Sequence, residues 1–153
     1  MTCILVAVDG SPRSVSVLET AIEIARTRHE RIVLFHSIGI PADIPQDLWK
    51  ATDEPLLDVM HKRAEAFLAE CARGIPVDVS ASVTREVALG VPWEAVCEAA
   101  RRNQADLVVI GSHGYGGLDR LLGTTAAKIV NHAPCNVLVV RARQGTDAAS
   151  DRP

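Results

Sequence analysis

Five short apolar runs are the feature that most limits what this chain can fold into. They are rich in valine, isoleucine and leucine and occupy residues 3–8, 32–38, 77–83, 107–110 and 137–140. Most are apolar almost throughout and lack the alternation of a strand that has one face in water. Strands covered by helices on both faces have this composition, so the runs predict a buried parallel β-sheet.

Amphipathic helical patterns lie between these runs. Apolar residues recur at spacings of three and four around residues 15–25 and again over residues 56–71. Ser11 precedes Pro12, which favours a helix that is N-capped by the Ser11 hydroxyl. We expect the first helix to begin near Arg13 and the second to end at Gly74. A third helix is expected to begin near Pro92, and a fourth to run over residues 124–131. The regular alternation of strand and helix predicts a doubly wound, three-layer α/β sandwich.

One domain accounts for the length and composition of the chain. Its 153 residues are 48% hydrophobic, and we expect one domain over residues 1–143 followed by a flexible tail at residues 144–153. The net charge of -3 comes without a basic stripe, which argues against nucleic acid as a partner. No run is long enough to span a membrane, and the first residues show no signal peptide. We therefore expect a cytoplasmic protein that does not bind membranes.

The four cysteines are spread along the chain and form no C-x-x-C pair. We expect Cys3, Cys71, Cys97 and Cys135 to be reduced, with Cys71 and Cys97 on apolar helix faces. His132 and Cys135 have an H-x-x-C spacing that can supply two zinc ligands, but no second pair stands nearby. Because tetrahedral zinc needs three or four clustered ligands, we expect no metal site.

Two segments follow predicted strands and are candidates for a ligand site. In an open parallel sheet, ligands bind outside the carboxyl ends of the strands, where the winding direction reverses. Asp9 follows the first strand, and a glycine-rich stretch at residues 111–125 follows the fourth and holds five of the ten glycines. If these two strands are neighbours, the Asp9 carboxylate and the glycine-rich stretch face one crevice.

The glycine-rich stretch matches neither of the two common phosphate-binding motifs. No glycine is followed by lysine, as a P-loop requires, and Asp119 stands where the dinucleotide motif needs its third glycine. Thr124 and Thr125 begin a predicted helix, whose unpaired N–H groups and partial positive charge can bind an anion. Tight turns alone can also explain the glycines. From the residues, a phosphate site and a purely structural loop both remain open.

Several separated segments resemble, in the same order, those of one known family. They are ILVAVDGS at residues 4–11, ALGVPWEAVCEAARRNQADLVVIGSHG at residues 88–114, GLDRLLGTT at residues 117–125 and NVLVV at residues 136–140. On these segments the chain resembles the universal stress protein (UspA) family over residues 3–141. The resemblance implies a Rossmann-like, adenine nucleotide alpha hydrolase-like sheet of five parallel strands in the order 3-2-1-4-5, with strands one and four side by side.

The same resemblance implies a site for an adenine nucleotide. ATP is the expected ligand, AMP and ADP are alternatives, and a divalent cation can accompany the triphosphate. By resemblance, Asp9 contacts the adenine or ribose end, and Ala7 and the main chain around Ser37 line the base pocket. The implied phosphate loop comprises Ile110, Gly111, Gly114, Gly123, Thr124 and Thr125.

The family also implies a role and a partner. The role is that of a cytoplasmic, nucleotide-dependent regulator of the stress response, which acts on an unidentified protein partner. The last strand, from Val137 to Val140, pairs across a homodimer in this family. We expect binding without efficient catalysis. Two alternatives stay open: a slow ATP hydrolase that uses His113, Asp9 or His36, and an interaction module that binds no nucleotide.

The spacing of the glycines departs from the family pattern at one point. The nucleotide-binding branch has nine residues between G-x-x-G and G-[ST], whereas eight separate Gly114 from Gly123 here. One residue spans up to about 3.5 Å of extended chain, enough to move a donor out of hydrogen-bond range. The contacts to base and ribose are expected to survive, and the geometry at the triphosphate is the part of the prediction most affected.

Overall fold

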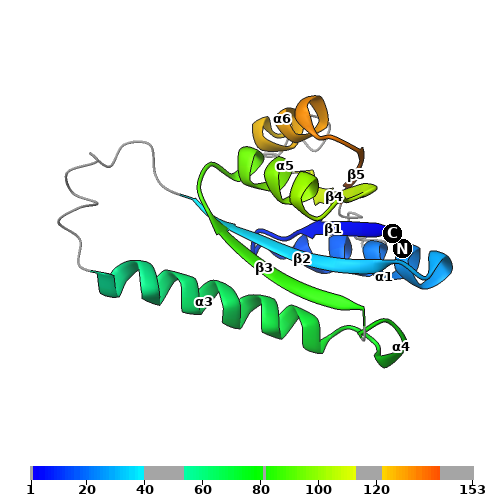
Figure 1. Ribbon diagram of the computed structural model, residues 1–153, viewed down its shortest axis with the longest axis horizontal. Helices are drawn as coiled ribbons and strands as arrows, with labels where there is room; N and C mark the ends of the chain where they lie inside the picture. The colour runs from blue at the N-terminus through cyan, green and yellow to red at the C-terminus, as the bar shows by residue number, and fades with distance from the viewer. Residues whose placement is uncertain (1, 40–53, 81, 113–121, 142–153) are drawn as a thin grey trace, which may run out of the picture.

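Figure 1 shows one parallel sheet between two layers of helices in the computed structural model, which describes residues 2–39, 54–80, 82–112 and 122–141. The strands are β1 (Cys3–Ala7), β2 (Arg31–Ile38), β3 (Val83–Leu89), β4 (Leu107–Gly111) and β5 (Asn136–Val140). Neighbouring strands all pair in parallel, and their order across the sheet is β3-β2-β1-β4-β5. The predicted fold class and the strand order 3-2-1-4-5 are therefore confirmed.

Helices cover both faces of this sheet. They are α1 (Ser14–Arg28), α3 (Glu54–Arg73), α4 (Val77–Ser80), α5 (Pro92–Arg102) and α6 (Thr124–His132). In Figure 1, α1 and α3 lie on one face of the sheet and α5 and α6 on the other. Along β1, Ile4 and Val6 belong to the core beneath α1 and α3, whereas Cys3 and Leu5 belong to the core beneath α5 and α6. Burial on both faces explains why the central strands are apolar almost throughout.

The third strand does not lie where the sequence pattern placed it. The strand predicted at residues 77–83 is wrong, because the short helix α4 occupies Val77–Ser80 and β3 follows it. Val79 is buried in the core beside α1, whereas Val77 is 88% exposed, and this alternation imitates that of a strand. β3 forms one edge of the sheet and, among the described strands, pairs with β2 alone; it carries exposed polar residues such as Arg85 in place of an apolar run.

α1 begins close to the predicted position near Arg13, but its cap differs from the prediction. The helix begins at Ser14, and its N-cap residue Arg13 makes no side-chain capping hydrogen bond. The Asp9 carboxylate, and not the Ser11 hydroxyl, serves as the acceptor in this turn: Asp9 Oδ1 accepts from the Ser11 N–H at 2.9 Å and from the Ser14 hydroxyl at 3.1 Å. The predicted Ser11 cap is therefore wrong, since an ionised acceptor forms the stronger hydrogen bonds.

Two predicted features lie outside the described residues. They are the centre of the glycine-rich stretch at residues 113–121, which includes His113 and Gly114, and the tail at residues 144–153. None of the helices in the described ranges has both the length and the apolar character needed to cross a membrane.

Candidate functional site

A cavity of about 250 Å³ lies at the carboxyl ends of β1 and β4. These two strands are neighbours, with Ile4 of β1 opposite Leu107 of β4. The chain leaves β1 for a helix on one face of the sheet and leaves β4 for a helix on the other face. The crevice expected where the winding direction reverses is therefore present between the two strands.

Apolar side chains form most of the walls of this cavity. They come from both helical layers and from the strand ends between them: Ala7, Val8, Val17, Phe35, Pro92, Val96, Ile110, Ala126 and Ile129. Such a surface suits a flat, poorly hydrated ring, because the ring and the wall both leave water when they meet.

The turn between β1 and α1 supplies the acidic group of the cavity. Gly10 has a φ of 79°, a left-handed conformation that glycine adopts without strain, and it turns the chain sharply after Asp9. The hydrogen bonds from Ser11 and Ser14 then hold the Asp9 carboxylate at the cavity, where Asp9 is exposed to solvent. A carboxylate in this place can accept hydrogen bonds from ligand hydroxyl groups.

Three helices begin at the cavity. Ser14 and Pro92 are the first residues of α1 and α5, and Thr125 is the second residue of α6; all three line the cavity. The first N–H groups of a helix have no acceptor within the helix, and this end carries roughly half a positive charge. Gly123 is the N-cap residue of α6 and has no side chain that could accept a hydrogen bond from the first N–H groups of the helix. The start of α6 therefore favours an anionic or hydrogen-bond-accepting group beside Thr125.

Most of the site residues predicted from the sequence meet at this cavity. Those that line it are Ala7, Asp9, Ser37, Ile110, Gly111 and Thr125. Gly123 and Thr124 stand beside Thr125 at the start of α6 but do not line the cavity. Gly114 lies outside the described residues. Residues from the ends of β1, β2 and β4 and from the start of α6 thus come together in one place.

No contact or backbone strain within the described residues requires a glycine at position 111. Its φ is not in the left-handed region, which among the described glycines holds only Gly10 and Gly90. A Cβ added at Gly111 would meet Val17 Cγ2 at 3.5 Å, an ordinary van der Waals contact. Neither backbone strain nor packing against the described residues explains the missing side chain, and a glycine here leaves room for a ligand to approach the backbone at the end of β4.

Arg13 is a cavity residue that the sequence reasoning missed. Its side chain is partly buried, and its Nη1 donates a hydrogen bond of 2.7 Å to the Ser112 carbonyl oxygen, just beyond β4. Of the described residues that line the cavity, Arg13 is the only lysine or arginine, and Asp9 is the only aspartate or glutamate. The available signal was its position, since Arg13 follows Asp9 by four residues within the turn that leaves the first strand.

Ser11 and His36 add two further polar groups to the cavity. The Ser11 hydroxyl oxygen is buried and has no hydrogen-bond partner among the described residues. His36 Nδ1 lies 2.7 Å from the Val8 carbonyl oxygen, and because a carbonyl only accepts, Nδ1 carries the proton. Phe67 packs edge-on against the His36 ring at a centroid distance of 5.3 Å. The Ser11 hydroxyl is therefore a group that a polar ligand can satisfy, and His36 is held in one orientation.

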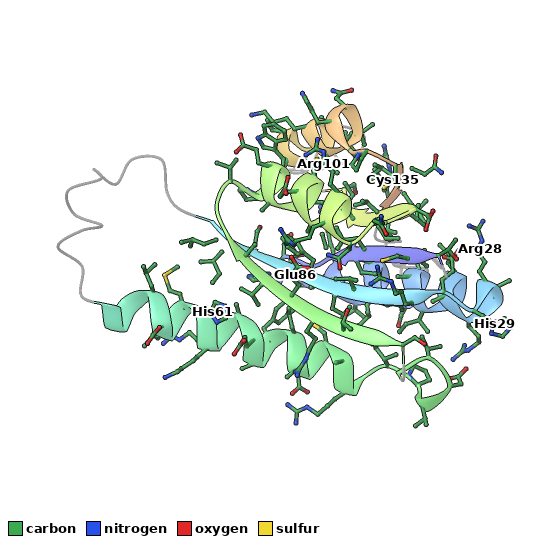
Figure 2. All side chains as sticks on the ribbon, viewed as in Figure 1. Arg28, His29, His61, Glu86, Arg101 and Cys135 are labelled. Carbon is green, nitrogen blue, oxygen red and sulfur yellow. The ribbon has the colours of Figure 1, made fainter. Side chains whose placement is uncertain are left out.

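Within the described ranges, no three His, Cys, Asp or Glu side chains are grouped so that they could hold a metal ion. Trp93 packs in a tilted arrangement on the His132 ring at a centroid distance of 4.9 Å, and His132 Nδ1 lies 2.8 Å from the Lys128 carbonyl oxygen. Cys135, labelled in Figure 2 just before β5, is a free cysteine, as are the other three. His132 thus packs against Trp93, and Cys135 packs against the core beneath α5 and α6.

Comparisons with known proteins agree on one family. The model of the Universal stress protein family matches residues 1–141. Universal stress protein A homolog 1 of Coxiella burnetii is 33% identical over 138 residues, which cover 90% of this chain and 94% of that protein. Universal stress protein UspA from Lactobacillus plantarum has a similar structure, with a TM-score of 0.78 at 27% identity over 92% of this chain and 97% of that chain. A universal stress protein crystallised in complex with cAMP shares the fold, with a TM-score of 0.70 at 23% identity over 91% of this chain and 96% of that chain.

Proposed function

Because the chain belongs to the universal stress protein family, we propose that it binds an adenine nucleotide between β1 and β4 and regulates the stress response accordingly. ATP is the proposed ligand, and ADP and AMP are the alternatives. The observation that carries the proposal is the single cavity in which apolar walls, the Asp9 carboxylate and the start of α6 meet. The related structure in complex with cAMP supports an adenine nucleotide as a ligand of this fold.

The proposed pose assigns one part of the nucleotide to each part of the cavity. The adenine ring packs on the apolar walls near Ala7 and Ile110 and reaches the main chain around Ser37. The ribose hydroxyls donate to Asp9, because a carboxylate is the strongest acceptor available to them. The phosphates lie at Gly111 and at the start of α6, with Gly114, Gly123, Thr124 and Thr125 as the proposed phosphate-binding residues.

When a triphosphate is bound, its phosphate oxygens would supply most of the ligands, other than water, of a divalent cation at this site. Asp9 is the only carboxylate among the described residues that line the cavity, and the pose assigns it to the ribose. Mg²⁺ is commonly held by substrate phosphates together with one or two carboxylates and several waters. The residues at the site therefore fit a cation that arrives with the nucleotide.

Direct identification of the ligand tests this proposal. Mass spectrometry of the small molecule that leaves the purified protein on denaturation is expected to return an adenine nucleotide. Equilibrium dialysis at millimolar ATP, ADP and AMP is expected to show saturable binding. No released nucleotide and no binding to any of the three would contradict the proposal.

The variant Gly111→Ala tests whether the nucleotide binds in the cavity beside Gly111. The added methyl group occupies space that the nucleotide needs, and affinity is expected to fall by about tenfold or more. Gly74→Ala is the matched control, since a Cβ there would also meet its nearest atom, the Cys71 carbonyl oxygen, at 3.5 Å, but far from the cavity. Equal affinity of the two variants would place the nucleotide elsewhere.

We propose binding without efficient hydrolysis. Phosphoryl transfer depends on positioning and on neutralisation of charge, and it needs a group that orients the attacking water. Asp9 Oδ1 is engaged with Ser11 and Ser14, and His36 Nδ1 with the Val8 carbonyl. Bound ATP is expected to stay intact over hours, as followed by chromatography of the nucleotide. Phosphate release above background would support the slow hydrolase instead.

We further propose a cytoplasmic homodimer that pairs through β5. Asn136–Val140 forms the sheet edge, and its four apolar residues are only partly buried in one chain. A regular apolar edge strand tends to associate unless a partner covers it. Sedimentation is expected to give twice the chain mass of 16.4 kDa, and Val139→Lys is expected to shift it to the monomer. A wild-type monomer would contradict this proposal, and cell fractionation would test the location.

A further inference from the structure

Arg13 occupies a position between the two strand ends that frame the cavity. It is the N-cap residue of α1, and so belongs to the turn after β1, yet its guanidinium donates to the Ser112 carbonyl oxygen beyond β4 at 2.7 Å. The hydrogen bond is partly buried and joins residues that are 99 positions apart in the sequence. The side chain is therefore held across the crevice, on the side from which the glycine-rich stretch departs.

The charges of the cavity are divided between two residues of this one turn. Arg13 carries the only fixed positive charge and Asp9 the only carboxylate among the described lining residues. Asp9 Oδ1 is anchored within its own turn by Ser11 and Ser14, whereas Arg13 reaches to Ser112. A ligand that has a hydroxylated part and an anionic part is thus matched at both ends.

A guanidinium suits this position better than an ammonium group. It is planar and carries five N–H donors in a fixed arrangement, so one guanidinium can donate to more than one acceptor at the same time. The hydrogen bond to Ser112 fixes the plane of the fork before any ligand arrives. The glycine-rich stretch contains no lysine, and its one arginine, Arg120, lies outside the described residues, so Arg13 is the cation that the described residues place at the cavity.

We infer that Arg13 binds the phosphate nearest the ribose and makes the site selective for phosphorylated nucleosides over nucleosides. The inference rests on the proposed function, because it concerns the same cavity and ligand class. Arg13 interacts with the charged phosphate of the ligand, whereas the apolar walls pack against its adenine ring. Affinity for a neutral nucleoside therefore depends on the walls and on Asp9 but not on Arg13, and Arg13 contributes to the gain in affinity on adding a phosphate.

Calorimetric titration with adenosine, AMP and ATP tests this inference in the full chain. The wild-type protein is expected to bind AMP at least about tenfold more tightly than adenosine, as one charge-assisted contact allows. In Arg13→Gln, the affinities for AMP and ATP are expected to fall by about 10- to 100-fold, and the affinity for adenosine to stay within about twofold. Arg13→Lys is expected to keep part of the preference for AMP, since it retains the charge but loses the fork.

Arg73→Gln is the matched control, since it removes one positive charge from the exposed surface of α3, where Arg73 pairs with Glu70. It is expected to leave all three affinities unchanged. Raising the salt concentration is expected to weaken AMP binding in the wild type and in Arg73→Gln but to have little effect on Arg13→Gln. A side chain that only shapes the cavity would not produce this difference in salt dependence.

Each outcome has a distinct meaning. If Arg13→Gln keeps the full preference for AMP over adenosine, or loses both ligands to the same degree, the inference is wrong and the proposed function stands. If the wild type binds none of the three ligands, the proposed function fails and the inference fails with it. Melting temperatures of the unliganded variants within about 2 °C of wild type establish that the fold is intact, and Arg13→Lys decides the matter if Arg13→Gln does not fold.

Discussion

Among single residues, Asp9 combines two roles that substitution can separate. Its Oδ1 accepts hydrogen bonds from Ser11 and Ser14, and its charge faces the proposed ribose site. Asp9→Asn keeps an acceptor oxygen, so the free energy of unfolding in urea is expected to stay near that of wild type, whereas Asp9→Ala is expected to lose about 1 kcal/mol. Both variants are expected to bind nucleotide more weakly, because a charged acceptor has been removed. Equal stability of Asn and Ala variants would refute the structural role.

Gly10 is the residue whose backbone conformation the turn requires. With a φ of 79° and open space where a Cβ would be, its substitution strains the backbone without any steric clash. Gly10→Ala is expected to lower the free energy of unfolding by about 1 kcal/mol. Gly39→Ala is the control, since it has the same open space and no left-handed φ, and it is expected to be neutral. Chemical denaturation of both variants checks this, and equal values would show that the turn relaxes.

At the level of helices and strands, the sequence locates every strand but β3, including the edge strand β5, which lies at Asn136–Val140 where residues 137–140 were predicted. β1, β2 and β4 are buried on both faces, and their apolar runs locate them to within a residue. β3 is an edge strand that contains Arg85 and Glu86, so its composition resembles that of a surface segment, and the alternation at Val77 and Val79 misled the assignment. An apolar run marks β5 although it also lies at an edge, whereas the charged residues within β3 leave it without such a run.

The sequence also predicts only some of the residues that line the candidate site. Strand ends and the family resemblance identify Asp9, Gly111 and Thr125, because their positions follow from topology. Arg13 and the unsatisfied Ser11 hydroxyl depend on how one turn is hydrogen-bonded, and the expected Ser11 cap concealed this arrangement. Side-chain direction within a turn cannot be read from spacing alone.

Glu86 connects strand β3 to the end of helix α5. On β3, and labelled in Figure 2, it pairs with Arg102 and accepts a 2.7 Å hydrogen bond from the Asn103 side-chain amide, at the end of α5. Glu86→Ala is expected to lower the free energy of unfolding by about 1 kcal/mol and to speed amide exchange in the last turn of α5. Glu70→Ala removes an exposed pair within α3 and is expected to cost less than about 0.5 kcal/mol. If both variants lose the same stability, Glu86 acts as an ordinary surface charge.

For the whole molecule, the free thiols link stability to alkaline pH. Burial raises the pKa of Cys3, Cys71, Cys97 and Cys135. For Cys97, which is 1% exposed, burial outweighs the opposing effect of the Arg101 guanidinium, labelled in Figure 2. A pKa that is higher in the folded state means that the unfolded chain releases the thiol proton first. The stabilisation from a buried neutral thiol is therefore complete below the unfolded pKa, about 8.5, and is lost as the pH rises toward the folded pKa.

The variant Cys97→Ala tests this linkage through the slope of the unfolding free energy against pH. Each buried thiol can contribute up to about 1.4 kcal/mol per pH unit to the fall in unfolding free energy above pH 8.5. Urea unfolding at about pH 7.5 and about pH 9.5, under reducing conditions, is expected to show a shallower fall for Cys97→Ala than for wild type. The comparison uses the difference between the two pH values, because the smaller side chain also lowers stability at both through lost packing. Because the two proteins differ only at Cys97, identical slopes would mean that the Cys97 thiol ionises as readily in the folded protein as in the unfolded chain.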